Sequence, residues 1–202
     1  MNGLSGESFI FEASLNIIPM KRNIWIFGSI AGAILVAFMI YATATCYANP
    51  EKFESNDVVG YIGFILIFSL IFVGVKNYRD KYSNGLVSFG RAFKIGAFIA
   101  LIASSMYTLA WIIDYYLFIP DFLDQYTKHV LWDAKQDGAT AAELAKKTEE
   151  MADFKEMYKN PLLVVIITYM EVLPIGLIVA LIAALILKKK RPAAPSATLT
   201  HA

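Results

Sequence analysis

Four long stretches without charged residues constrain this chain more than any other feature of its sequence. They run from Ile24 to Ala48, Val58 to Val75, Ile95 to Ile113 and Pro161 to Leu187, and the last contains one exception, Glu171. A helix needs about 20 apolar residues to cross roughly 30 Å of hydrocarbon, and in lipid the backbone must satisfy its own hydrogen bonds. The sequence therefore predicts an all-α membrane protein with four transmembrane helices, at about residues 24–48, 58–75, 95–119 and 161–187. The composition agrees, because only 17% of the residues are charged, against about 25% in soluble domains.

The first stretch resembles a secretory signal peptide in two respects. Lys21 and Arg22 precede it, and Ala42-Thr43-Ala44 resembles a cleavage site. Its apolar run is, however, about twice the 7–15 residues of a signal core. We therefore expect this stretch to remain in the mature protein as the first span.

Lysine and arginine are distributed unevenly among the segments outside the spans. Lys21 and Arg22 directly precede the first span, and basic residues outnumber acidic ones between the second and third spans and after the fourth. The segment Asp114–Asn160 instead has six lysines and ten acidic residues, and Asn49–Asp57 has one lysine and three acidic residues. Cytoplasmic loops of membrane proteins are enriched in Lys and Arg. We therefore predict that both termini are cytoplasmic and that the two acidic segments lie outside.

The chain divides into three parts. Residues 20–191 form one transmembrane domain, and residues 192–202, which are rich in Pro, Ala, Ser and Thr, are predicted to be a disordered tail. Residues 1–19 are either a disordered extension or the product of an upstream start site. Met20 followed by two basic residues is a natural start for a membrane protein, so the native start at Met1 or Met20 stays open.

The external segment at residues 120–160 is predicted to be an amphipathic helical hairpin. Apolar residues recur at helical spacing on both sides of Asp137-Gly138, which is a break signal. Thr140 and Glu143 have the spacing of a capping box, and Asn160-Pro161 is suited to start the fourth span. We expect the hairpin to be either a lid over the bundle or a surface for a protein partner.

The loop between the second and third spans is basic and aromatic. Asn84-Gly85 is a turn signal, and Ser88 is a reasonable N-cap for the following helix. We expect its cations to contact lipid headgroups rather than nucleic acid, since the patch is short and adjoins the membrane. These predicted headgroup contacts are Lys76, Arg79, Lys81, Arg91 and Lys94.

Small residues recur four apart in three of the spans. The stripes are Gly28 and Gly32; Gly96, Ala100, Ser104 and Thr108; and Gly176, Ala180 and Ala184. Small residues allow the backbones of membrane helices to approach closely. The stripes indicate either a compact bundle or a dimer, and the sequence does not separate the two.

Glu171 is the residue with the strongest functional signal. It lies about ten residues into the fourth span, roughly 15 Å below the outer surface by helical rise. A charged side chain at mid-membrane costs about 2.5–3.5 kcal/mol, so such residues usually face the bundle interior and have a partner. Pro174 removes a backbone hydrogen bond one turn later and frees a carbonyl near the carboxyl group. By depth, the candidate partners are Ser69, Ser104, Ser105, Tyr107 and Thr108.

Two hypotheses for Glu171 remain open. In the structural one, burial keeps the carboxyl group protonated, and it fixes helix register through a hydrogen bond between helices. In the functional one, Glu171 is the proton or cation site of a small transporter or coupled subunit.

No pattern in the sequence indicates an enzyme. We find no nucleophile elbow, phosphate loop or intramembrane aspartate pair, and therefore predict no catalytic residues and no cofactor. His129 with Asp133 four residues later falls short of the usual zinc ligand count, so no metal site is predicted. The single cysteine, Cys46, reads as a small buried apolar residue.

Several segments resemble a bacterial membrane-protein family known only as domain of unknown function 4199, which is frequent in Bacteroidota. The segments are Met20 to Trp25, Val75 to Lys81, Ser88 to Gly96, Met157 to Pro161, Glu171 to Ile178 and Leu187 to Lys190. The resemblance covers about residues 20–191 and implies an inner-membrane protein of Gram-negative bacteria with about four spans. It implies no activity, so no functional residues are carried over.

The leading functional hypothesis from the sequence is a non-enzymatic accessory or scaffold subunit that acts through helix packing and the hairpin. Its expected partners are membrane lipid and either another protein or further copies of itself, but not nucleic acid. The alternative is a small proton- or cation-coupled transporter, or a channel-like oligomer, that uses Glu171.

Overall fold

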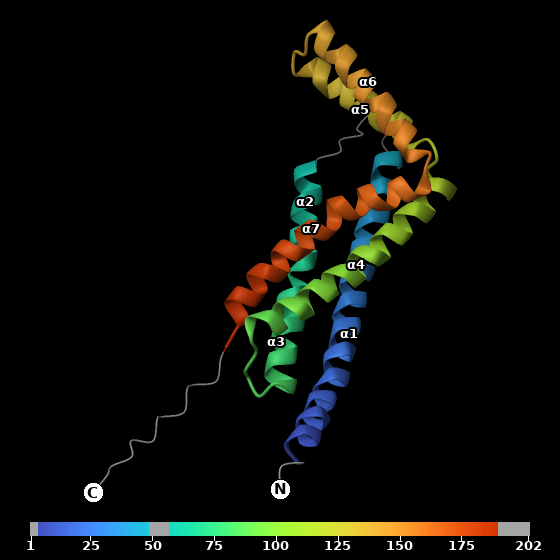
Figure 1. The fold of residues 1–202 in the computed structure, drawn as a ribbon. Helices are drawn as coiled ribbons and strands as arrows, with labels where there is room; N and C mark the ends of the chain where they lie inside the picture. The colour runs from blue at the N-terminus through green and yellow to red at the C-terminus, as the bar shows by residue number, and fades with distance from the viewer. Residues whose placement is uncertain (1–3, 49–56, 190–202) are drawn as a thin grey trace, which may run out of the picture.

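The computed structural model describes residues 4–48 and 57–189 and consists of helices joined by short loops (Figure 1). The described residues contain no strand, although Val87 and Lys189 form an isolated antiparallel bridge. The helices are α1 (Leu4–Ala48), α2 (Asp57–Phe68), α3 (Leu70–Tyr82), α4 (Phe89–Leu117), α5 (Phe122–Gln136), α6 (Ala141–Tyr158) and α7 (Pro161–Leu187).

Four helical stretches are long and apolar enough to cross a membrane, which confirms the predicted fold class. They are Ile18–Tyr47, Gly60–Tyr82, Phe89–Leu117 and Pro161–Leu187. The second extends seven residues beyond its predicted end at Val75 and includes charged side chains in its last two turns. The helix is longer than its uncharged part because intrahelical bonding continues where the side chains are polar. This is the architecture of a multi-pass membrane protein.

Helix α1 begins well before the membrane-spanning part. It is helical from Leu4, and Pro19 lies inside it. Whether residues 1–19 are a disordered extension or the product of an upstream start site stays a prediction. Residues 4–18 contain one glycine and no proline, so few residues oppose a helix there. The predicted tail at residues 192–202 and most of the acidic segment Asn49–Asp57 lie outside the described residues.

The second span consists of two helices that meet at Ser69. The Ser69 hydroxyl donates to the Leu66 carbonyl at 2.6 Å. The Ser69 amide contacts the carbonyls of both Ile65 and Leu66, at 3.0 and 3.2 Å. A serine that bonds back to its own helix commonly bends it, and here it separates α2 from α3 without ending the span.

Helix α4 lies between α1 and α7 and makes close contacts with both. A Cβ atom added at Gly96 would lie 2.8 Å from the Cβ of Ala180, and one at Gly176 would lie 2.8 Å from the Cβ of Ala100. On the other side of α4, a Cβ atom at Gly28 would lie 2.9 Å from the Cβ of Ile102. The small-residue stripes therefore serve helix packing within one chain.

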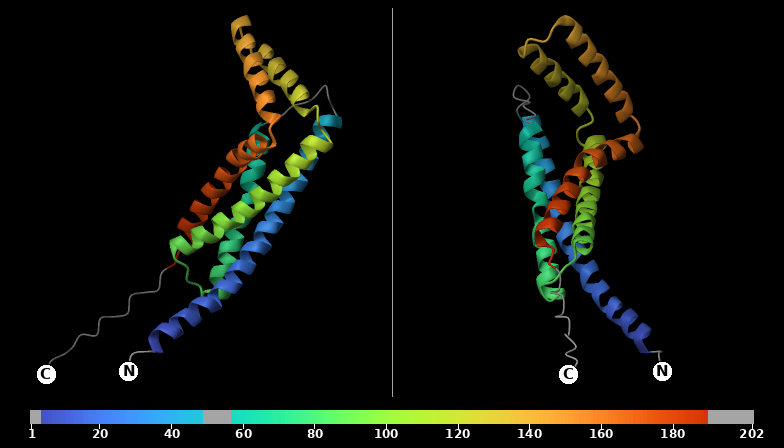
Figure 2. Two further views of the ribbon diagram at one scale, coloured as in Figure 1. Left: turned by 45° about the vertical axis from the view of Figure 1, so that its right-hand side comes forward. Right: turned by 60° about the vertical axis from the view of Figure 1, so that its left-hand side comes forward.

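The two ends of the bundle differ in composition. The end of α3, the start of α4 and the end of α7 lie at one end of the molecule, and α5 and α6 lie at the other (Figure 2). The first end carries Lys21, Arg22, Lys76, Arg79, Lys81, Arg91, Lys94, Lys188 and Lys189, and is called the basic end. The opposite end is called the α5–α6 end. Which end faces the cytoplasm stays a prediction.

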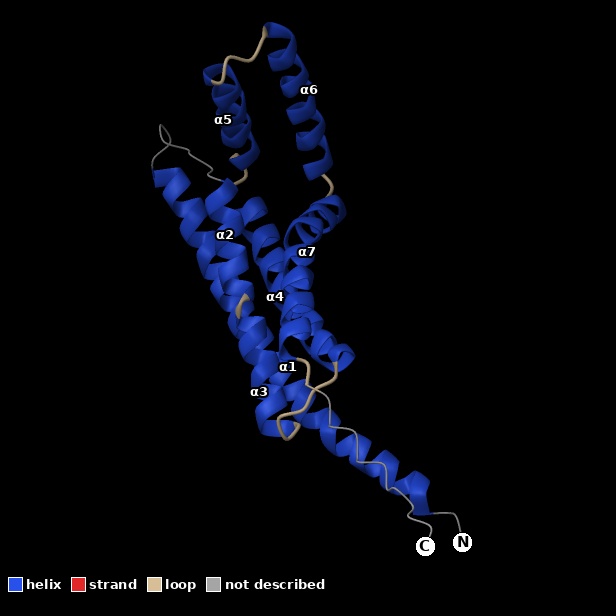
Figure 3. Ribbon diagram, turned by 90° about the vertical axis from the view of Figure 1, so that its left-hand side faces the viewer, coloured by secondary structure: helices blue, strands red, loops and turns tan. Residues whose placement is uncertain are grey.

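Helices α5 and α6 lie beside each other beyond the ends of α4 and α7 (Figure 3). An ion pair between Lys155 and Asp124, with Nζ and Oδ1 2.6 Å apart, joins them. The capping box predicted at Thr140 and Glu143 is present, and Gly138 after α5 has φ of +83°. The predicted caps at Ser88 and Asn160 are also confirmed, because each side chain accepts a backbone amide of the helix it precedes.

Candidate functional site

A cavity of about 460 Å³ lies toward the α5–α6 end of the bundle. Residues from α1, α2, α4, α5, α6 and α7 line it, so segments from nearly the whole chain contribute. Ten of the 19 lining residues are aromatic: Phe38, Tyr41, Tyr61, Phe64, Tyr107, Trp111, Phe122, Tyr126, Phe154 and Tyr158. Cavities of this volume hold drug-sized molecules and are typically lined by apolar and aromatic side chains with a few polar groups.

Edge-to-face contacts between rings fix much of the cavity wall. The ring centroids of Phe64 and Tyr107 are 5.6 Å apart, and those of Trp111 and Phe122 are 5.1 Å apart. Such contacts contribute about 0.5–1.5 kcal/mol beyond simple burial. They join α2 to α4 and α4 to α5, so the wall is formed by packing between helices.

Glu171 supplies the one charged side chain among the lining residues. A carboxyl group at this depth is expected to face the bundle interior, but Glu171 is exposed in the structure and borders the cavity. The reason is its position on α7. Thr168 and Val172 are on the buried face, and Glu171 lies at the edge of that face. Helix α7 continues through Pro174 to Leu187.

The side chains predicted as partners of Glu171 lie in different places. Tyr107 shares the cavity with Glu171. Ser69 and Ser105 donate to carbonyls of their own helices, and Ser105 also accepts a hydrogen bond from Tyr169 at 2.6 Å. The hydroxyls of Ser104 and Thr108 are buried and have no hydrogen-bond partner among the described residues. The structure thus brings one predicted partner to the cavity, and the roles of the whole set stay predictions.

Tyr158 connects the cavity to a small core formed by residues of α5, α6 and α7. That core contains Leu123, Tyr158 and Val164. The backbone carbonyl of Tyr158 accepts a hydrogen bond from the Tyr116 hydroxyl at 2.8 Å. Burial raises the pKa of the Tyr158 hydroxyl to about 12, and nearby Glu171 adds to the increase. Tyr158 therefore remains a neutral hydroxyl at the cavity wall.

Two hydroxyl groups of α1 contact acidic residues near the cavity. The Tyr47 hydroxyl donates to Asp121 at 2.9 Å, and the Thr43 hydroxyl approaches Asp114 at 3.4 Å. Hydrogen bonds from Gln125 and Tyr47 hold the pKa of Asp121 below its usual value. Negative charge therefore lies at the α5–α6 end near the start of α5.

The basic end is closed by polar contacts that sequence reasoning missed. The buried Asn23 side chain donates to the Gly74 carbonyl at 2.9 Å and accepts from the Asn77 amide at 2.6 Å. The Val87 and Lys189 backbones exchange two hydrogen bonds, of 3.0 and 2.8 Å. One signal was available in the sequence, because Asn23 is a polar residue directly before the uncharged stretch that starts at Ile24.

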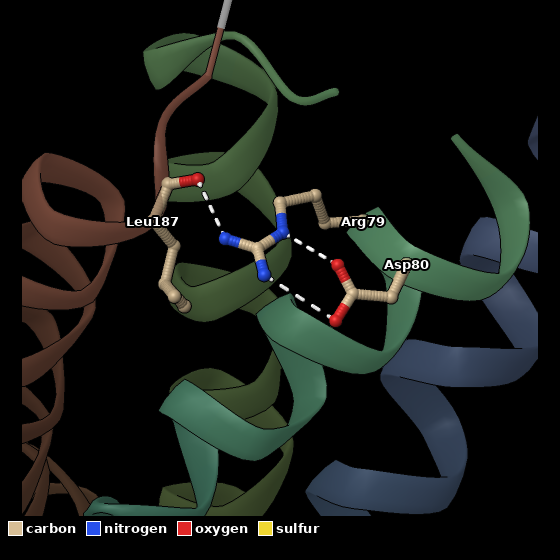
Figure 4. Close-up of polar contacts among 3 residues, drawn as sticks. All are labelled: Arg79, Asp80 and Leu187. Carbon is tan, nitrogen blue, oxygen red and sulfur yellow. Dashed lines mark hydrogen bonds and ion pairs between the residues drawn. The ribbon is translucent and has the colours of Figure 1, made fainter. Parts of the chain in front are cut away.

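Arg79 differs from the other predicted lipid contacts. Figure 4 shows its guanidinium group between the Asp80 carboxylate, at 2.7 Å, and the carbonyl of Leu187, at 3.5 Å. A cation at the last carbonyls of a helix is favourable because those groups lack intrahelical donors. Arg79 thus joins α3 to the end of α7. Lys76, Lys81, Arg91 and Lys94 have exposed side chains, and their contact with headgroups stays a prediction.

The other residues considered for chemistry do not form a metal site. His129 contacts Asp133 on the same helix, with Nε2 and Oδ2 3.0 Å apart. Cys46 is half-buried and lines the cavity. Within residues 4–48 and 57–189, no group of three His, Cys, Asp or Glu side chains is arranged to hold a metal ion.

Comparisons with known proteins bear on the family alone. No curated protein and no solved structure matches the chain. The model of one family matches residues 26–189. This range contains the α5–α6 pair and all four spans, apart from the first residues of the first span. The chain therefore belongs to the family described as "Protein of unknown function (DUF4199)".

Proposed function

We propose that this protein is a small membrane transporter that binds its ligand in the aromatic cavity and uses Glu171 as a proton-binding group. The observation that carries the proposal is that a membrane-spanning helix, α7, places one carboxyl group on the wall of the cavity. Ionisable residues inside spans are costly, and those that border cavities commonly mark ion or substrate pathways. The proposal requires no catalytic residue and no cofactor.

The depth of Glu171 supports a coupling role. It is ten residues beyond the start of α7 at Pro161, which corresponds to roughly 15 Å along the helix axis. The cavity extends from this depth to the start of α5 and the end of α6, since Phe122 and Tyr158 also line it. A proton at Glu171 thus shares one cavity with any molecule that enters near α5 and α6.

Proton flux in proteoliposomes tests the coupling role. The liposomes contain a pH-sensitive dye and receive an external pH step, with valinomycin and potassium present to compensate charge. We expect the wild type to equilibrate faster than protein-free liposomes and Glu171→Gln to match the protein-free rate. Glu156→Gln, an exposed carboxyl group on α6, is the matched control and should keep the wild-type rate. Equal flux in Glu171→Gln and wild type would show that Glu171 carries no proton.

An accessory or scaffold role is the second candidate, and the α5–α6 pair supports it. The pair extends beyond the bundle, and Trp132 on α5 is 58% exposed. Aromatic residues are enriched at the centres of protein interfaces. Capture from native membranes in mild detergent should recover a stoichiometric partner with the wild type and less with Trp132→Ala. Recovery of homo-oligomers alone would contradict a scaffold for another protein.

The proposed location is the bacterial inner membrane, with the basic end in the cytoplasm. The excess of Lys and Arg at that end supports this orientation. A Cys46→Ala background with a single cysteine at Lys147 on α6 should react with an impermeant maleimide in intact spheroplasts. A cysteine at Lys188 should react only after lysis. The opposite pattern would invert the topology.

A further inference from the structure

We propose that the cavity binds organic cations that carry an apolar body, such as arylammonium or alkylammonium compounds. This inference rests on the proposed function and specifies its ligand class. It comes from the combination of aromatic walls with a single carboxyl group, and from the contacts made by the polar groups around them.

The walls offer the faces and edges of ten aromatic rings in a cavity of about 460 Å³. The face of an aromatic ring is negative, and a cation within about 6 Å of its centre is attracted to it. Tyr41 and Tyr61 leave much of their rings exposed. An organic cation gains here both from burial of its apolar body and from its charge.

The charges around the cavity have the sign that a cation requires. Among the described residues, Glu171 is the one charged residue that lines the cavity, and no lysine or arginine lines it. Lys155 follows the cavity residue Phe154, but Asp124 holds its ammonium group at 2.6 Å. Asp114 is close to the lining residue Thr43. An anionic ligand would meet these carboxylates without a compensating cation among the lining residues.

The lining is poorly suited to an inorganic cation. Magnesium and calcium take about six or more oxygen ligands. Besides tyrosine hydroxyls and Glu171, the lining offers the hydroxyls of Thr43, Thr45 and Thr168. Each of these hydroxyls donates to a carbonyl of its own helix, at 3.1, 2.8 and 2.8 Å. The cavity lining thus offers one carboxylate and mostly aromatic carbon. This suits an organic cation, which does not need oxygen ligands to replace a shell of bound water.

The experiment uses Trp111, which lines the cavity, as its own reporter. The chain has three tryptophans, and the other two, Trp25 and Trp132, are 64% and 58% exposed. Trp25→Phe and Trp132→Phe therefore leave Trp111 as the single tryptophan of the full-length protein. The protein is studied in lipid nanodiscs, and protein-free nanodiscs correct for partition of the probes. The probes are phenyltrimethylammonium, the neutral compound tert-butylbenzene of the same shape, and benzenesulfonate.

We expect phenyltrimethylammonium to change Trp111 fluorescence at concentrations at least about tenfold lower than the other two probes, because charge adds to burial. Glu171→Gln should lower the affinity for the cation alone, by about tenfold, and Glu156→Gln should leave this affinity unchanged. Tyr61→Leu should weaken the cation about two- to fivefold, since one ring face is lost, whereas Tyr61→Phe should not. Circular dichroism and gel filtration verify that each variant is folded.

Three results overturn the inference. If the cation and the neutral compound bind equally and Glu171→Gln has no effect, the ligand class is wrong while the cavity remains a binding site. If benzenesulfonate binds best, the sign of the charge is wrong. If no probe changes Trp111 fluorescence, both the ligand class and the binding cavity fail, and the proton-flux measurement then judges the role of Glu171 independently.

Discussion

The basic end and the α5–α6 end of this bundle are built from different contacts. At the basic end, backbone groups are held directly, since Asn23 binds the Gly74 carbonyl and Val87 pairs with Lys189. At the α5–α6 end, aromatic side chains hold the helices apart around a cavity. The comparison shows how four similar spans produce one closely packed end and one end with a cavity.

The difference has a physical basis in side-chain size. Gly74 and Gly96 let backbones approach in the half of the bundle near the basic end, where a Cβ atom at either would meet side chains within 3.0 Å. At Gly60, on the cavity, a Cβ atom would meet none of the described residues within 4 Å. Gly74 and Gly96 therefore allow close helix contacts near the basic end, whereas Gly60 borders the cavity.

The largest effect is expected from the same substitution made near the two ends. Gly96→Ala places a methyl group 2.8 Å from the Cβ of Ala180, and should lower the free energy of unfolding by about 2 kcal/mol through overpacking. Gly60→Ala should be neutral or stabilise by up to about 1 kcal/mol, because alanine is the better helix former. Unfolding in mixed micelles by dodecyl sulfate measures both. Equal destabilisation by the two variants would remove the distinction between the ends.

A smaller effect is expected from polar contacts. Asn23→Ala leaves the Gly74 carbonyl without its side-chain donor in a buried site, which should cost about 1–2 kcal/mol. Tyr47→Phe removes an exposed hydrogen bond to Asp121, which keeps its bond to Gln125, and should cost less than about 0.5 kcal/mol. The same unfolding measurement applies. A larger cost for Tyr47→Phe would show that the α5–α6 end is the more firmly held.

The smallest effect concerns Arg79. Arg79→Gln removes the cation from the end of α7 but leaves the Val87–Lys189 pair intact. We expect amide exchange at Val87 and Lys189 to rise about threefold, with global stability almost unchanged, since this end opens locally. Hydrogen–deuterium exchange with mass spectrometry measures it, and peptides from α5 serve as the internal control. Unchanged exchange would mean that Arg79 contributes nothing to closing the basic end and is available to lipid.

Local features of the fold were predictable because neighbouring residues determine them. The caps at Ser88, Thr140 and Asn160 follow from the side chain and the free amides next to it. The four spans follow from the length of their apolar stretches. The start of α1 was less predictable, since Pro19 is a boundary signal in the sequence but lies inside the helix.

The candidate site was only partly predictable. Glu171 was evident as a charge in an apolar span, but its exposure on the cavity depends on how α7 is rotated against α4. Depth alone suggested five partners for Glu171, and the structure brings only Tyr107 into the same cavity. Ser105 faces Tyr169 instead. Depth along a helix is readable from sequence, whereas the direction in which a side chain points relative to other helices is not.

The sequence by itself determined that this chain crosses a membrane as helices, where those helices lie, and how positive charge is divided between the loops. These properties depend on the transfer of each segment between water and lipid, which is a sum over neighbouring residues. Tertiary structure alone decided that the small-residue stripes meet within one chain, that Arg79 reaches the end of α7, and that ten aromatic rings and Glu171 line one cavity. These contacts join residues far apart in the chain, and they depend on helix rotation and tilt, which packing against every neighbour sets together.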